Sequence, residues 1–152
     1  MRIGWLRELY PEAKFIHIYR NPLNVLPSTI NMWKIVGSQN AMNRRFRVPE
    51  LESVTEFLVK MQAEIKEQLS KMPTGTYTEV RFENLEQDPV AELKRIYRDI
   101  GLDFSEKLEQ KINNFLIANA DFEKNKYQLE EDEKTMISKK LADFMKGYGY
   151  LK

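Results

Sequence analysis

Two short segments with the composition of β-strands lie far apart in this sequence, and the residues between them follow helical patterns. Residues 14–19 read Lys-Phe-Ile-His-Ile-Tyr, and residues 76–82 are rich in β-branched and aromatic side chains. A long helical connection favours parallel pairing, because antiparallel neighbours are usually joined by short turns. Residues 14–19 are apolar on both alternations, which predicts a strand covered by helices on both faces. We therefore expect an α/β fold with a short parallel sheet flanked by helices.

The helices are marked by periodic apolar residues and by signals at their ends. Residues 51–72 carry the clearest apolar stripe, stepping by three and four. Asn21-Pro22 and Asp88-Pro89 each place an N-cap residue before a proline at the first helical position. Gly101 follows the second of these helices, where a left-handed C-cap belongs. The helix from Pro22 is expected to reach about residue 34 with a kink at Pro27, and further helices are expected near residues 3–9, 108–116 and 131–146, with a polar loop at 37–49.

The length of 152 residues fits a single domain spanning 1–152. Only two strands are evident, and a sheet of two parallel strands leaves an unpaired edge on each. The pattern therefore predicts an α/β layer architecture from which strands are missing. We expect the exposed edges to make the protein a homo-oligomer or to leave it marginally stable.

The charge and residue types exclude several classes of function. The 24 basic and 23 acidic side chains give a net charge of +1, without the basic excess typical of proteins that bind nucleic acids or membrane surfaces. The absence of cysteine and the single histidine exclude disulfides, cysteine nucleophiles and metal sites built from several imidazoles, so no metal is expected. No signal peptide or long apolar run is evident, which favours a cytoplasmic location in a bacterium.

A candidate anion site follows the first strand. Arg20 stands at its carboxyl end, the edge where open α/β sheets bind ligands, and the next helix opens at Pro22 with an N-terminus that favours anions. The planar fork of Arg20 suits a phosphate, and Ser28 lies about 9 Å further along the helix. Taken singly, Arg20 could be a solvated charge and Ser28 an ordinary helix residue. Their pairing favours phosphate binding.

The segment Arg20-Asn21-Pro22-Leu23-Asn24-Val25-Leu26-Pro27-Ser28 resembles the 3′-phosphate-binding element of sulfotransferases, with Arg and Ser at the spacing of that family. Residues 10–22 are similar to the family's helix–strand entry, and residues 79–89 to the strand and turn that pass beside the adenine. Residues 124–127 and 147–150 resemble its C-terminal segment. The resemblance spans nearly the whole chain and is closest to the broad bacterial-type group of PAPS-dependent enzymes.

The resemblance implies that Arg20 and Ser28 bind the 3′-phosphate of PAPS or PAP, which are 3′-phosphoadenosine 5′-phosphosulfate and its desulfated product. Phe82 occupies a position that is commonly Tyr in the family, so it keeps an aromatic contact with the nucleotide. The loop that binds the 5′-phosphosulfate and the catalytic His or acid precede this region in the family. No Gly-rich phosphate loop occurs in the 152 residues. The catalytic residues are therefore unknown, and the chain matches the C-terminal portion of the family. The resemblance thus implies a truncated three-layer nucleotide-binding domain of the P-loop NTPase-like type.

Members of the family transfer a sulfuryl group from PAPS to a hydroxyl or amine of a small-molecule or glycan acceptor. We expect this chain to carry the 3′-phosphate nucleotide site, and to bind PAP without transferring sulfuryl groups by itself. Two alternatives remain open. One is a nucleotide kinase-like domain, which would prefer ATP to PAP. The other is a non-catalytic remnant or a self-associating interaction module.

Other polar residues allow a structural and a functional interpretation. His17, between Ile16 and Ile18, is interpreted as a core or partly satisfied histidine rather than a base. The basic residues of the 37–49 loop and of the C-terminal segment either contact an anion or form solvated turns, and solvation is the commoner case for such runs; these residues are Arg44, Arg45, Arg47, Lys124 and Lys126.

Overall fold

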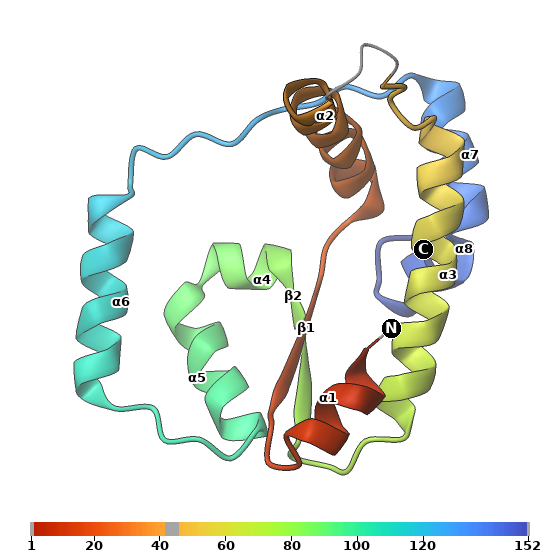
Figure 1. Ribbon diagram of the computed structural model, residues 1–152. Helices are drawn as coiled ribbons and strands as arrows, with labels where there is room; N and C mark the ends of the chain where they lie inside the picture. Colours follow the sequence, from red (N-terminus) through yellow and green to blue (C-terminus); the bar gives the residue numbers. More distant parts are fainter. Residues whose placement is uncertain (1, 42–45, 152) are drawn as a thin grey trace. The chain divides into compact units, whose positions relative to one another are not determined.

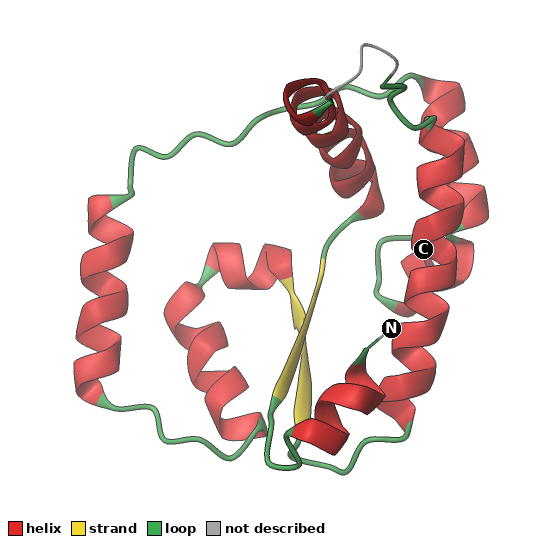
Figure 2. Ribbon diagram, in the orientation of Figure 1, coloured by secondary structure: helices red, strands yellow, loops and turns green. Residues whose placement is uncertain are grey.

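The computed structural model describes residues 2–41 and 46–151, so Arg44 and Arg45 lie outside the described residues. Within this part, the chain forms a series of helices and one short sheet (Figures 1 and 2). The elements in chain order are α1 (Ile3–Leu9), β1 (Phe15–Tyr19), α2 (Pro22–Asn40), α3 (Leu51–Ser70), β2 (Tyr77–Arg81), α4 (Phe82–Gln87), α5 (Pro89–Asp99), α6 (Glu106–Ala118), α7 (Glu131–Lys140) and α8 (Ala142–Gly147).

The chain divides into two compact units. The first unit contains Met1–Arg20 and Lys66–Lys124, and the second contains Asn21–Ile65 and Asn125–Lys152. The chain passes from one unit to the other more than once, and one of these passages lies within α3. The organisation of residues 1–152 as one domain stays a prediction.

The sheet belongs to the first unit and confirms the predicted parallel pairing. β1 and β2 run in the same direction, with Phe15 opposite Tyr77 and Tyr19 opposite Arg81. The α/β class is therefore confirmed, with helices against a short parallel sheet. Three strand ends differ from the prediction by one residue, because Lys14 and Thr76 precede the strands and Phe82 begins α4 instead of ending β2. Phenylalanine suits a strand, but Glu83 in the first turn favours a helix start at this point.

Helix α5 packs on β2 and forms the core of the first unit. Val80 is buried against Ile96 and Ile100, with partly buried Leu85, Leu93 and Tyr97 around them. Ile18 lies opposite Val80 in the register, on the same face of the sheet, yet 54% of its surface is exposed. Ile16 is also exposed. The prediction that β1 is covered on both faces is therefore wrong, because α5 covers β2 and no described element covers Ile16 and Ile18.

The core of the second unit joins α2 to α7 and α8. Leu26, Ile137, Leu141 and Met145 are its buried centre. The single helix predicted at 131–146 is divided into α7 and α8, with Leu141 between them. Leu141 keeps its side chain in the core, so the apolar period continues across the division.

The start of α2 agrees with the prediction, whereas its end does not. Asn21 caps the helix as predicted, its side-chain oxygen accepting from the Leu23 backbone N–H at 3.0 Å. The helix then continues through Pro27 to Asn40, beyond the predicted end near residue 34. Gly37 lies within this extension and is buried, and the ring of Phe46 occupies the space that a side chain at Gly37 would need.

Two signals around α5 are also confirmed. The carboxylate of Asp88 accepts from the Ala91 backbone N–H at 3.0 Å, which caps the helix before Pro89. Gly101 has a φ of +70°, the left-handed conformation expected after the last turn. These signals fix both ends of the helix that covers β2.

Candidate functional site

Arg20 and Phe82 meet at the carboxyl end of the sheet. Arg20 directly follows β1 and Phe82 directly follows β2, and the parallel register brings the two strand ends together (Figure 1). The guanidinium carbon of Arg20 lies 4.3 Å from the centroid of the Phe82 ring. Both residues are half-buried. This is a cation–π contact, in which the positive guanidinium is attracted to the electron-rich face of the ring.

The guanidinium of Arg20 has no protein acceptor among the described residues. Its Nε is buried and has no hydrogen-bond partner there. A buried donor without a partner costs about 1–3 kcal/mol, so such groups are usually satisfied in proteins. Stacking on Phe82 covers a face of the guanidinium but satisfies none of its N–H groups, because these point outward in the plane. An anion that accepted these donors would complete the site.

Arg95, in the same unit, differs from Arg20 because its guanidinium donors have protein acceptors. Its donors reach Glu92 at 2.7 and 3.0 Å, Asp99 at 2.5 Å, Thr78 at 3.2 Å and the backbone oxygen of Glu79 at 2.8 Å. The hydrogen bonds to Glu92, together with the charges of Glu92 and Asp99, raise the pKa of Arg95 above its ordinary value. Its donors are taken by the protein itself, so Arg95 ties α5 to β2 and is not available to a ligand.

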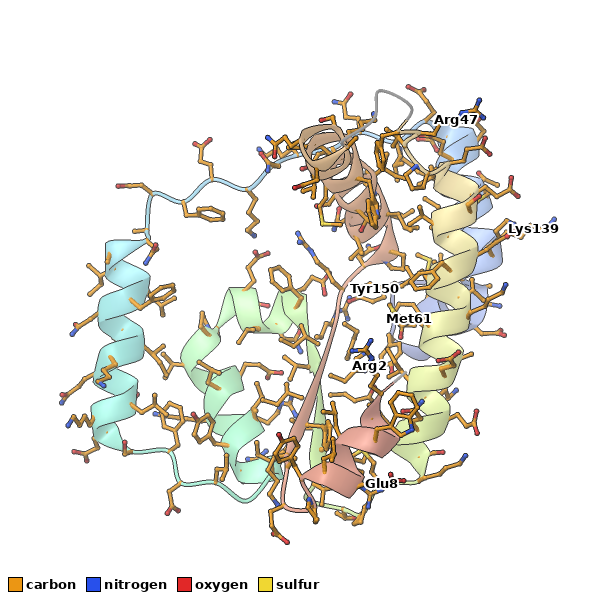
Figure 3. All side chains as sticks on the ribbon, in the orientation of Figure 1. Arg2, Glu8, Arg47, Met61, Lys139 and Tyr150 are labelled. Carbon is orange, nitrogen blue, oxygen red and sulfur yellow. The ribbon has the colours of Figure 1, made fainter. Side chains whose placement is uncertain are left out.

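Of the other basic residues named from the sequence, Lys124 forms an ion pair with Glu86. Lys126 and Arg47 are exposed (Figure 3 labels Arg47). Arg81, the residue before Phe82, lies 3.4 Å from Glu83 through its Nε. The cation–π contact with Phe82 is made by Arg20.

His17 is a partly satisfied histidine, as predicted. Its Nδ1 lies 3.0 Å from a carboxylate oxygen of Glu79, and 13% of its side chain is exposed. Glu79 is its direct partner in the strand register, so the pair links β1 to β2. Next to it, burial and then the charge of Glu79 raise the pKa of Tyr19, while Arg81 and Arg95 oppose this rise. The sequence alone does not reveal Glu79 as the partner of His17, because it does not give the register of β1 and β2.

Ser28 lies in the second unit, within α2 and half-buried. Its hydroxyl has no hydrogen bond to another described residue, although Thr29 beside it donates to the Val25 backbone oxygen at 2.9 Å. Arg20 belongs to the first unit. The convergence of Arg20 and Ser28 on one phosphate therefore stays a prediction.

Among residues 2–41 and 46–151, no cluster of three or more His, Cys, Asp or Glu side chains has a geometry that could hold a metal ion. None of the helices in the described part of the chain combines the length and hydropathy that crossing a membrane requires.

Comparisons with known proteins identify the family of the chain. The family model described as "Sulfotransferase family" matches residues 1–106, a range that includes Arg20, Ser28 and Phe82. The chain belongs to the sulfotransferase family. No solved structure gives a significant match to the chain.

Two curated relatives are each 30% identical to the chain over 154 residues. Both are named omega-hydroxy-beta-dihydromenaquinone-9 sulfotransferase Stf3, one from Mycobacterium bovis (strain ATCC BAA-935 / AF2122/97) and one from Mycobacterium tuberculosis (strain CDC 1551 / Oshkosh). The alignments cover 98% of this chain and 38% of each relative. The chain thus spans less than half the length of the curated relatives it matches.

Proposed function

We propose that this chain carries the 3′-phosphate nucleotide site of a PAPS-dependent sulfotransferase, with Arg20 and Ser28 as phosphate ligands and Phe82 beside them. The observation that supports this proposal most directly is the guanidinium of Arg20, which stacks on Phe82 and has no described protein acceptor. It lies at the carboxyl end of the sheet, where open α/β folds bind nucleotides. Arg20 also directly precedes the start of α2 in the chain, and the positive end of a helix dipole favours an anion.

The chemistry of the reaction explains why such a site matters. An acceptor oxygen forms a bond to the sulfur of PAPS while the bond from sulfur to the bridging 5′-phosphate oxygen breaks. PAP leaves, and the proton of the acceptor passes to a base. Positioning and charge stabilisation supply most of the catalysis in transfers of this type. Anchoring the 3′-phosphate fixes the nucleotide at a point remote from the reacting sulfur, and thereby aligns the sulfuryl group.

The acceptor in this proposal is a hydroxyl compound. The support is the name of the two relatives, which describes a sulfotransferase for an omega-hydroxylated menaquinone. An alcohol acceptor needs a base to remove its proton as the new bond forms. The sequence does not identify that base, so the catalytic residues are not assigned. No metal is required by this chemistry.

Calorimetry with PAP and adenosine 5′-phosphate (AMP) tests the site, because only PAP carries the 3′-phosphate. We expect PAP to bind the 152-residue protein about ten- to a hundredfold more tightly than AMP, as a charge-assisted Arg–phosphate contact contributes about 1.5–3 kcal/mol. Arg20→Gln should remove most of this difference. Equal affinity of the unmodified protein for both nucleotides would refute the site.

Two outcomes of the same experiment would favour the alternatives. Tighter binding of ATP than of PAP would support a nucleotide kinase-like domain. Failure to bind any of the three nucleotides at millimolar concentration would support an interaction module without a nucleotide site. Transfer of radiolabelled sulfate from PAPS to an alcohol by this chain alone would contradict the expectation that it binds without catalysing transfer.

A further inference from the structure

The contact between Arg20 and Phe82 assigns the aromatic side chain a different role from the one implied by family resemblance. Resemblance places Phe82 beside the adenine. In the structure its ring lies 4.3 Å from the guanidinium carbon of Arg20. We propose that Phe82 is a positioning residue for the phosphate: its ring holds the guanidinium of Arg20 and thereby determines how strongly the protein discriminates a 3′-phosphate. This inference rests on the proposed function.

An arginine that binds a ligand needs a neighbouring group to hold its side chain in place. An arginine side chain has many rotamers, and one that binds a ligand tightly is usually fixed by the protein beforehand. Carboxylates do this for Arg95, but they also take up its donors. Arg20 has no carboxylate partner among the described residues, so the ring of Phe82 is the group that restrains it.

An aromatic ring is suited to this task because it occupies a face of the guanidinium and leaves the in-plane donors unpaired. The five N–H groups of an arginine lie in the plane of the fork, where two phosphate oxygens can accept them together. A ring does not compete for these donors, whereas a carboxylate would have to be displaced by the ligand. Phe82 therefore fixes the orientation of Arg20 without neutralising its charge.

The position of Phe82 in the fold makes the restraint rigid. Phe82 is the first residue of α4, and it directly follows β2, whose Arg81 lies opposite Tyr19 of β1. Arg20 directly follows Tyr19. Both partners are thus attached to ends of neighbouring hydrogen-bonded strands, and the sheet itself sets their separation.

Substitutions at Phe82 test the proposal through the ratio of AMP and PAP dissociation constants. Phe82→Leu keeps an apolar side chain and removes the ring, so PAP binding should weaken roughly three- to tenfold while AMP binding stays unchanged. Phe82→Tyr restores the ring and should restore the affinity for PAP. If Phe82→Leu weakened PAP and AMP equally, the ring would contact the base, and the inference would be overturned while the proposed function stood.

Phe104 provides a matched control for general damage to the unit. The Lys94 ammonium lies 5.7 Å from the centroid of the Phe104 ring, and Phe104 also packs edge-on against Tyr97. Phe104→Leu therefore removes a ring from another cation–π pair of the first unit. We expect it to lower stability without changing the ratio of AMP and PAP affinities. An equal change in that ratio for Phe104→Leu and Phe82→Leu would contradict a specific role for Phe82.

A titration with inorganic phosphate separates this inference from the proposed function. The Nε–Hε NMR signal of Arg20, assigned by its loss in Arg20→Lys, should move on addition of phosphate, and Phe82→Leu should require three- to tenfold more phosphate. If this holds but PAP binds no better than AMP, the nucleotide proposal fails, and Phe82 still positions Arg20 for a phosphate other than the 3′-phosphate of PAP. An Arg20 signal that titrates identically with and without the ring, or that never responds to phosphate, overturns the positioning role.

Discussion

β1 and β2 are parallel neighbours of equal length, but the two strands have different surroundings. Val80 of β2 is buried under α5. Arg95 on α5 donates to the Glu79 backbone oxygen of β2, and its other donors find acceptors in Glu92 and Asp99. On β1, Ile18 is exposed on the same face of the sheet, and Arg20 at the strand end has no acceptor among the described residues. β2 thus has the surroundings of a structural strand, whereas β1 carries the groups that remain available for binding.

The contrast also separates two uses of arginine. Arg95 contributes to folding, because its hydrogen bonds exist without a ligand. Arg20 contributes less to the stability of the fold, because a stacked guanidinium with unpaired donors gains at most a cation–π contact of about 0.5–2 kcal/mol. Substituting the two residues should therefore affect different properties of the protein, and the predictions that follow test this difference.

The largest expected effect is on the free energy of unfolding of Arg95→Met. The change leaves Glu92 and Asp99 without their shared partner, and the loss should be about 2–3 kcal/mol, measured by urea denaturation. Arg20→Met is the matched control. It loses the cation–π contact but also removes a buried donor without a partner, so the two effects offset and stability should change by no more than about 0.5 kcal/mol. Similar losses for the two variants would remove the distinction between β1 and β2.

The exposed face of β1 should drive self-association, because Ile16 and Ile18 lie uncovered on it. Light scattering should show a dimer or a larger species, and Ile18→Lys should weaken the association at least about tenfold by removing apolar burial. Ile117→Lys on α6, at a side chain that is also exposed, should leave the association unchanged. A compact monomer at high protein concentration would contradict this prediction.

Ser28→Ala should weaken PAP binding by about two- to tenfold, less than any loss of Arg20, because it removes one neutral donor. Ser38 on the same helix offers the control, since its hydroxyl already donates to the Ile35 backbone oxygen at 2.8 Å. Calorimetry should show no change for Ser38→Ala. If the two serine variants bound PAP equally well, Ser28 would be an ordinary helix residue.

The smallest expected effect concerns Tyr19, the β1 residue whose environment includes the charges of β2. Burial and Glu79 raise its pKa, so the folded state favours the protonated phenol. The stability that this contributes is present below the ordinary pKa near 10 and is lost as the pH rises through the raised value. An NMR titration of the phenol should therefore have its midpoint above 10. A midpoint at or below that value would show that Arg81 and Arg95 dominate.

Local signals in the sequence were sufficient for the features that depend on neighbouring residues. Asn21, Asp88 and Gly101 cap helices as predicted, because a cap is formed by a side chain or backbone within a few residues. The parallel pairing of β1 and β2 was also predictable, because a long helical connection leaves few alternatives. These features set the ends of the helices and the pairing of the two strands.

The features that depend on distant residues could not be predicted in the same way. The exposure of Ile16 and Ile18 depends on which strand α5 covers, and the alternation of a strand does not contain that information. The stacking of Arg20 on Phe82 requires the register of two strands about sixty residues apart. The resemblance therefore named Arg20 and Phe82 as candidates, but it did not predict the contact between them.

The missing side chain of Gly37 has a consequence for the tolerance of this chain to substitution. A glycine inside a helix costs about 0.5–1 kcal/mol relative to alanine, so most helices improve when it is replaced. Here a methyl group at Gly37 would lie 2.0 Å from the ring of Phe46, far inside a van der Waals contact. A substitution that favours the helix in isolation would therefore require the ring of Phe46, which is 38% exposed, to move away from α2.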